Sequence, residues 1–197
     1  MPYAPEHKEQ THARIVECAR RMFNRHGFEA VSIDQIMASA GLTRGGFYHH
    51  FANKEALYSE AIASYARCEG AVPVDFTASA RQVVLQMIGA YLSHQHLESL
   101  DNHCPMIALP SDVARAGPVV RRTYQQLLAG MVAMFERGIE PADRDARQAA
   151  LAIAALCVGG MVLARTIEDA DLAAEVREAA RALALDVAGF NGTAAAA

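Results

Sequence analysis

The chain has 197 residues, which is enough for a full hydrophobic core in one compact unit or in two small units that share a helix. Its 18 Lys and Arg residues against 22 Asp and Glu residues give a net charge of −4, which over the whole chain argues against a nucleic-acid partner. No stretch of 18 uncharged apolar residues is present, so we expect no membrane span. The closest approach, residues 148–164, is flanked by Arg147 and Arg165 and is expected to be a buried helix.

Apolar residues recur at helical spacing along the chain, and no alternating pattern of useful length predicts a strand. The sequence therefore predicts an all-α fold. The first helix is expected over about residues 9–26, with Ile15, Ala19 and Phe23 on one face, and Gly27 is expected to end it.

Residues 32–51 have the pattern of two short helices joined by a tight turn. Ser32 is a predicted N-cap, with Gln35 at the capping-box position. Gly41 stands where a left-handed residue ends the first helix, and Thr43 is expected to cap the second. Two helices joined by a glycine-containing turn form the helix-turn-helix plan, in which the second helix enters the major groove of DNA.

The local charge agrees with this plan, although the net charge does not. Residues 1–60 carry seven basic and seven acidic residues, so the rest of the chain supplies the net negative charge. Between Asp34 and Glu55 no acidic residue occurs, whereas Arg44 and Lys54 both lie there. We expect a polyanion to meet this stretch without local repulsion.

Two strings within residues 10–62 are typical of one family: AxxMFNRHGFEAVSI and IMASAGLTRGGFYHHFANKEALYSEAI. Since their glycines, the Phe47-Tyr48 pair and the Lys54-Glu55 pair all fall in register, the chain resembles the TetR family of bacterial transcriptional regulators. The resemblance implies about nine helices, a three-helix DNA-binding head, a ligand-binding body and a homodimer. It also implies a repressor that a small molecule releases from a palindromic operator.

On this resemblance we expect a helix-turn-helix head at residues 1–52, a connecting helix at 53–69, and a ligand-binding and dimerisation domain at 70–189. Asn53 is the predicted cap of the connecting helix. Residues 190–197 are expected to be a disordered tail. Breaks in the apolar pattern predict body helices over about 77–97, 105–116, 118–138 and 141–168, followed by a last helix that Asp171 caps.

The resemblance assigns DNA contacts, position by position, to Ser32, Thr43, Arg44, Gly45, Tyr48, His49 and Lys54. Arg44 is the expected base reader, because a guanidinium can bind guanine O6 and N7 in bidentate fashion. Lys54 is expected to hold the phosphate backbone. The consecutive Gly45 and Gly46 are poor helix formers. Either they let the backbone approach the duplex closely, or the packing of neighbouring phenylalanines holds a helix that tolerates them.

The last two helices carry apolar stripes that suit helix pairing. The resemblance assigns them to a four-helix bundle across a two-fold axis, and the alternative is an intrachain core. The residues expected at the dimer interface are Ile153, Leu156, Gly160, Leu163, Leu172, Val176, Leu183 and Val187.

The body is rich in methionine, whose flexible and polarizable side chain suits a pocket for an apolar or aromatic effector. A methionine stripe at helical spacing is also common in an ordinary core, so both interpretations stay open. The candidate pocket residues are Met87, Tyr91, Met106, Met131, Met134, Phe135 and Met161.

Cys104 precedes Pro105, a favoured first residue of a helix, so its thiol is expected at a helix N-terminus, where thiol pKa values are lowered. This allows a redox- or electrophile-sensing regulator; the alternative is a small capping or core residue. A metal site formed by His94, His96, His103 and Cys104 is a further, weaker alternative. HExxH and GxSxG are absent, and we predict neither an enzyme nor a cofactor. The N-terminus lacks a basic-then-apolar signal pattern, so we expect a cytoplasmic protein.

Overall fold

The computed structural model describes residues 5–67, 73–139 and 145–190. Over these ranges the chain forms the α-helices α1 to α10 and the 3₁₀-helices η1 to η3, and contains no strand. This confirms the predicted all-α fold, with a helix count close to the one expected. The helices group into two compact units, Met1–Cys68 with Leu100–Leu127 and Glu69–Ser99 with Leu128–Ala197, and helix α8 contributes residues to both.

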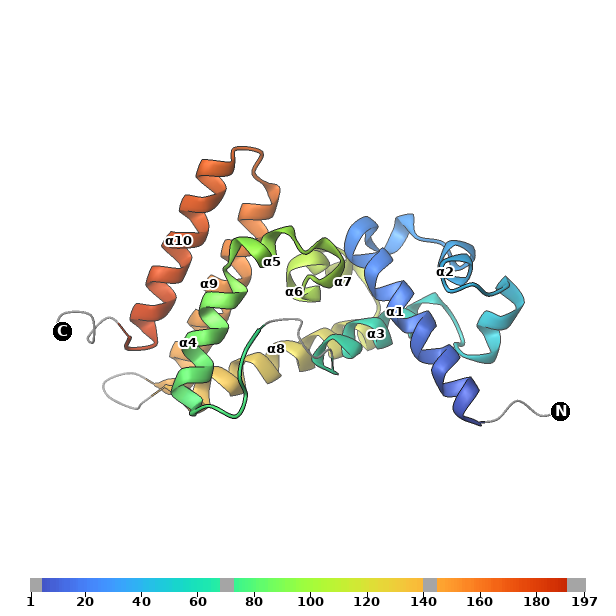
Figure 1. The fold of residues 1–197 in the computed structure, drawn as a ribbon, viewed down its shortest axis with the longest axis horizontal. Helices are drawn as coiled ribbons and strands as arrows, with labels where there is room; N and C mark the ends of the chain where they lie inside the picture. The colour runs from blue at the N-terminus through green and yellow to red at the C-terminus, as the bar shows by residue number, and fades with distance from the viewer. Residues whose placement is uncertain (1–4, 68–72, 140–144, 191–197) are drawn as a thin grey trace. The chain divides into compact units, whose positions relative to one another are not determined.

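The first unit combines the predicted head with a stretch from the middle of the chain (Figure 1). Residues 100–127 lie in this unit, although we had expected them in the body. The elements of the unit are α1 (Pro5–Ala30), α2 (Ile33–Ser39), η1 (Arg44–His49), α3 (Lys54–Ser64), η2 (Tyr65–Arg67), η3 (Leu100–Asn102), α6 (Pro105–Ala108), α7 (Pro110–Arg115) and the start of α8 (Pro118–Gly138).

Large apolar side chains hold this unit together. Phe23 of α1 packs edge-on against Tyr58 of α3, with ring centroids 5.0 Å apart, and both side chains are fully buried. Phe47 and Phe51 lie in the same core, with ring centroids 5.6 Å apart. Burying such side chains contributes on the order of 1.5–3 kcal/mol each, so the core fixes η1 and α3 against α1.

The predicted local signals around the turn are largely confirmed. Ser32 and Gln35 form a capping box, and Gly41 adopts a φ of +68° just after α2. The Asn53 side chain accepts a hydrogen bond from the Ala56 backbone N–H and caps α3. Thr43 stands at the N-cap position of η1 but makes no capping hydrogen bond through its side chain.

The element after the turn differs from the α-helix expected over residues 44–51. It is a 3₁₀-helix that ends at His49. Two consecutive glycines lose much backbone entropy in a helix, and short elements readily take the tighter 3₁₀ form.

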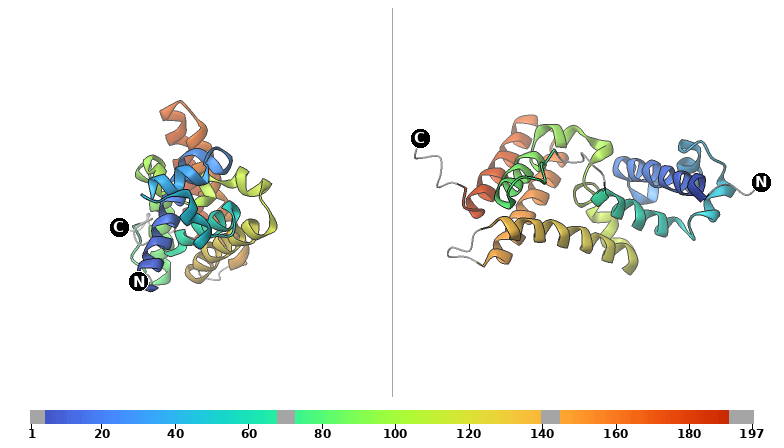
Figure 2. Two further views of the ribbon diagram at one scale, coloured as in Figure 1. Left: turned by 90° about the vertical axis from the view of Figure 1, so that its right-hand side faces the viewer. Right: turned by 60° about the horizontal axis from the view of Figure 1, so that its bottom comes forward.

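The second unit is built on a helical hairpin. Its elements are α4 (Ala80–Tyr91), α5 (His94–Glu98), the end of α8, α9 (Ala146–Thr166) and α10 (Ala170–Val187). Helices α9 and α10 lie side by side, as Figure 1 and the right view of Figure 2 show. A Cβ placed on Gly160 would lie 2.7 Å from the Cβ of Ala180. The two helices therefore approach closely because position 160 has no side chain.

Several predicted boundaries are wrong. The helix expected over 77–97 is two helices, because Ser93 caps α5 with a hydrogen bond from the His96 N–H. The helix expected over 105–116 is interrupted where Pro110 starts α7. The last helix is capped by Asp169 rather than Asp171, since the Asp169 carboxylate accepts from two backbone N–H groups.

Three other expectations fall wholly or partly outside the described residues. These are the start of a helix at 141, the start of the ligand-binding and dimerisation domain at 70, and most of the tail at 190–197. The part of the penultimate helix that is described begins at Ala146 and is capped by Asp145.

Helix α9 is long and apolar enough to cross a membrane by length and composition, with a mean hydropathy of 1.9 over an 18-residue window. Within the described chain, 44% of that window is buried. Core helices of soluble proteins pass the same test, so it gives only weak support for a span. The helix expected to be buried is thus half covered: Ile153 and Met161 are fully buried, whereas Leu151 and Leu163 are exposed.

Candidate nucleic-acid interface

Residues of the turn and η1 divide cleanly between the core and the surface. Phe47 is fully buried, whereas Tyr48 is 60% exposed. The other side chains and backbone positions predicted to meet DNA here, namely Thr43, Arg44, Gly45 and His49, are all exposed. The buried phenylalanine anchors the element while its neighbours face outward, as an element that contacts an external partner requires.

Arg44 forms an ion pair with Asp34, the acidic residue that precedes the basic stretch in the sequence. Its Nη1 donates a hydrogen bond of 2.6 Å to Oδ2 of Asp34, in the first turn of α2. Both side chains are more than half exposed, at 62% and 54%. The surface around Arg44 is therefore not free of acid, which corrects the expectation drawn from the sequence.

The two glycines differ in their surroundings. A Cβ added to Gly45 would meet nothing within 4 Å. One added to Gly46 would make ordinary contact, 3.5 Å, with Cε of Met37. Packing within the described chain thus gives no reason for glycine at position 45.

Lys54 begins α3 and is half buried. Its Nζ lies 4.1 Å from the centroid of the Phe28 ring, a cation–π arrangement. Desolvation by burial lowers the pKa of this ammonium group. Ser32 is exposed, and its hydroxyl is occupied in the capping box of α2.

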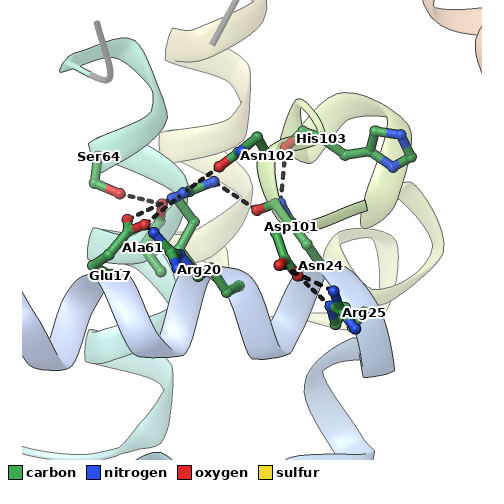
Figure 3. A network of polar contacts seen from close by, with 10 residues as sticks. Glu17, Arg20, Asn24, Arg25, Ala61, Ser64, Asp101, Asn102 and His103 are labelled. Atoms are coloured by element: carbon green, nitrogen blue, oxygen red, sulfur yellow. Dashed lines mark hydrogen bonds and ion pairs between the residues drawn. The ribbon is translucent and has the colours of Figure 1, made fainter. Parts of the chain in front are cut away.

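A polar network that sequence reasoning missed joins α1 to residues 101–103 (Figure 3). Arg20, only 4% exposed, donates from Nη1 to the Asp101 carbonyl at 2.9 Å and from Nη2 to Oδ1 of Asn102 at 3.0 Å. It also bonds Glu17, and that bond is the main cause of a lowered pKa for the Glu17 carboxyl. Asn24 donates to the His103 carbonyl at 2.8 Å.

The C-terminal part of α1 is held in a second way. The backbone leaves helical geometry at Gly27, with a φ of +77°, but α1 then continues to Ala30, so Gly27 interrupts the helix that it was expected to end. Just after it, Oδ2 of Asp112 accepts a hydrogen bond of 3.0 Å from the Phe28 N–H. A Cβ on Gly27 would lie 2.9 Å from that carboxylate oxygen. Two independent groups of polar contacts therefore tie residues 101–103 and Asp112 to α1. The only local signal for them in the sequence was a glycine at the end of the first helix.

The residues proposed for an effector pocket do not all lie in one unit. Met106 belongs to the first unit, and the other six belong to the second. Of those six, four are buried and two are half buried; the buried ones are Tyr91, Met131, Phe135 and Met161, and the half-buried ones are Met87 and Met134. The candidate pocket residues are thus divided between the two units, and their role in binding an effector stays a prediction.

The second unit also contains a buried arginine that sequence reasoning did not single out. Arg177 of α10 is 8% exposed and donates from Nη1 to the Leu92 carbonyl, at the C-terminal end of α4, over 3.0 Å. The Nδ1 of His96 donates a hydrogen bond of 2.8 Å to the carbonyl oxygen of Tyr91. These two side chains satisfy carbonyls that the end of a helix leaves without an intrahelical partner.

The predicted dimer residues separate into two groups. Ile153 and Gly160 are buried within the chain and serve the intrachain core. The others lie on the outer side of the hairpin, three of them exposed and three half exposed; these are Leu163, Leu172 and Leu183, and Leu156, Val176 and Val187.

The redox and metal alternatives gain no support. Cys104 is 1% exposed and precedes a helix of only four residues, so its thiol is not accessible to a reagent in this structure. His94 pairs with Glu98, and His96 lies in a different unit from His103 and Cys104. Among the described residues, no three His, Cys, Asp or Glu side chains lie in a group that could hold a metal ion.

Comparisons with known proteins agree with this geometry. Residues 15–61 match the family described as "Bacterial regulatory proteins, tetR family". The Transposon Tn10 TetC protein of Escherichia coli is 46% identical over 54 residues, which is 27% of each chain. The Bacillus subtilis HTH-type transcriptional regulator YfiR is 33% identical over 87 residues, 44% of this chain and 42% of its own. The matched segments thus span well under two thirds of these relatives.

Solved structures extend the likeness to the fold of most of the chain. The E. coli NemR structure in its reduced form has a TM-score of 0.74 at 17% identity, covering 90% of this chain and 96% of that one. The TetR regulator TylP of Streptomyces fradiae has a TM-score of 0.66 at 20% identity, covering 91% and 87%. Residues 15–61 therefore match the TetR family of bacterial regulatory proteins, and most of the chain has a fold similar to that of a solved TetR regulator.

Proposed function

We propose that the protein is a homodimeric transcriptional repressor that binds a palindromic DNA operator and leaves it when a small molecule binds the body. The observation that carries the proposal is the outward face of the turn and η1, where Arg44, Gly45, Tyr48 and His49 are exposed on an element anchored by buried Phe47. Exposed side chains on the second element of a helix-turn-helix are suited to contact base edges.

Each predicted DNA contact has a role in this proposal. Arg44 reads a base, and Tyr48 and His49 contact phosphate or the edge of the groove. Lys54 contacts a phosphate from the N-terminal end of α3, where the backbone N–H groups add a favourable field. Gly45 lets the backbone approach the duplex, which the open space around its Cβ position supports.

Exposed leucines of the α9–α10 hairpin support dimerisation. Leu163 is 56% exposed, Leu183 50% and Leu172 47%. An apolar patch of this kind marks an interaction surface, and a second copy of the same hairpin would cover it. A dimer also places two η1 elements about one turn of DNA apart, which a palindromic operator requires. Two weakly charged heads would then bind together where one would bind poorly.

The effector is expected in the second unit, among its buried methionine and aromatic side chains. This supports an apolar or aromatic ligand. Binding would shift the population toward a conformation in which the two heads no longer fit successive grooves. A protein with this function would work in the cytoplasm, and no cofactor is required.

The test is selection of bound duplexes from a random library by the purified protein. We expect enrichment of an inverted repeat whose half-sites are about 10 bp apart, centre to centre. Arg44→Ala should lose on the order of 1–3 kcal/mol, or about 5- to 150-fold, and relax preference at one base of each half-site. A wild-type protein that enriches no sequence would refute the proposal. A screen of small apolar molecules by thermal shift, followed by operator release, tests the effector.

A further inference from the structure

We infer that Asp34 is a positioning residue for Arg44: its carboxylate holds one nitrogen of the guanidinium and so determines which edge of Arg44 faces the DNA. The inference rests on the proposed DNA-binding function and names a determinant of its sequence preference. It starts from the juxtaposition of an acid on α2 and a base on η1, ten residues apart in the chain.

The frame on which Asp34 stands is rigid. It is the second residue of α2, directly inside a helix whose start is fixed by the Ser32–Gln35 capping box. Two residues further along, Ile36 and Met37 are buried in the core of the unit. A short, exposed carboxylate on such a frame has a defined position, whereas the long side chain of Arg44 has many rotamers when nothing holds it.

The hydrogen bond selects among the donors of Arg44. A guanidinium has N–H groups on Nε, Nη1 and Nη2 in a fixed planar arrangement. Asp34 takes Nη1. Among the described residues, neither Nε nor Nη2 of Arg44 makes a hydrogen bond to the protein. These two groups form the side edge of the guanidinium, which presents two parallel N–H bonds suited to O6 and N7 of guanine.

Charge adds to this selection. The Asp34 carboxylate repels phosphates, so it disfavours Arg44 rotamers that contact the DNA backbone. This repulsion favours base contact by Arg44 over phosphate contact and should raise discrimination at the cost of non-specific affinity.

A purely structural role predicts something different. An acid in the first turn stabilises a helix through the helix dipole, and exposed ion pairs add little to stability. If Asp34 had only that role, its removal would change the melting temperature slightly and leave base preference unaltered.

The experiment measures dissociation constants by fluorescence anisotropy for three duplexes. They are the selected operator, the operator with the Arg44-dependent base pair exchanged, and an unrelated duplex. Asp34→Asn is nearly isosteric and removes the charge. We expect it to lower discrimination between the first two duplexes about tenfold and to raise affinity for the unrelated duplex.

The matched control is Glu55→Gln. Glu55 is exposed and acidic in the first turn of α3, as Asp34 is in α2. The Glu55→Gln substitution removes the same charge from the start of a helix but does not alter a contact of Arg44. It should therefore leave discrimination between the first two duplexes unchanged. The second control is a cycle with Arg44→Ala: in that background Asp34→Asn should no longer alter discrimination.

The outcomes separate the inference from the function on which it rests. If the wild-type protein shows no selectivity, both are overturned. If the wild type is selective and Asp34→Asn keeps full discrimination, only the positioning role is overturned. It is also overturned if Asp34→Asn raises affinity for all three duplexes equally, or if its effect persists in the Arg44→Ala protein.

Discussion

Gly45→Ala separates folding from DNA approach more sharply than any other single change in the head. Within the chain the new methyl group meets nothing within 4 Å, so no steric cost to folding arises. Alanine loses less backbone entropy than glycine, so stability should stay constant or rise by up to about 1 kcal/mol. On the DNA, a methyl group inserted between backbone and duplex must push the surfaces apart. We expect this to cost on the order of 1–3 kcal/mol, or about 5- to 150-fold in operator affinity.

Gly46→Ala is the matched control, because the two changes are chemically identical and adjacent. The methyl group at position 46 would make an ordinary 3.5 Å contact with the Met37 side chain inside the protein. It should therefore leave operator affinity close to that of the wild type. Affinity is measured by fluorescence anisotropy on the selected operator, and stability by thermal unfolding followed by circular dichroism. Unchanged operator affinity in the Gly45→Ala protein would refute the close-approach argument, and glycine at that position would then need another explanation.

The remaining predictions concern charge, assembly, packing and pH. Lys54→Ala should weaken binding to all duplexes similarly and reduce the salt slope of binding by about one; a sequence-dependent loss would contradict a phosphate contact. Leu163→Glu, on the outer side of α9, should convert the dimer to a folded monomer in light scattering, and an intact dimer would place the interface elsewhere. Gly160→Ala should destabilise the fold by about 1–3 kcal/mol relative to Gly130→Ala, which adds its methyl group in open space; equal urea midpoints at fixed protein concentration would contradict the close α9–α10 packing. Burial lowers the pKa of His96 in the folded protein, so stability should fall as pH drops below about 6.5, where the unfolded chain binds the proton first; His96→Gln should reduce that dependence in urea titrations at pH values on either side.

Local signals in the sequence predicted the head with good accuracy, because the interactions that define it are short in range. The capping box at Ser32, the left-handed Gly41 and the Asn53 cap each involve residues within four positions of one another. Where two local signals competed, prediction failed. Asp171 was predicted to cap the last helix, but the Asp169 side chain accepts the hydrogen bonds from the N–H groups of Asp171 and Leu172.

Two further predictions were wrong because they relied on apolar periodicity alone. The α-helix expected after the turn is the 3₁₀-helix η1, and two helices expected in the middle of the chain are each interrupted. Helical periodicity does not distinguish an α-helix from a short 3₁₀-helix, since neighbouring spacings of three and four residues overlap. Ser93 and Pro110 were available as stop signals, and each interrupts a stretch that the apolar pattern had joined.

The sequence by itself determined the all-α class, the match of residues 15–61 to the TetR family and the position of the turn, because each depends on residues that are neighbours along the chain. Tertiary structure alone decided which distant groups meet. The Asp34 carboxylate lies beside Arg44, so an acidic group is present next to the basic stretch. Arg20 and Asn24 form hydrogen bonds with residues that lie 82 and 79 positions further along the chain, in the same unit. Such pairs cannot be recognised from sequence periodicity, because a hydrogen bond between two distant segments requires only two particular residues and produces no repeating pattern along the chain.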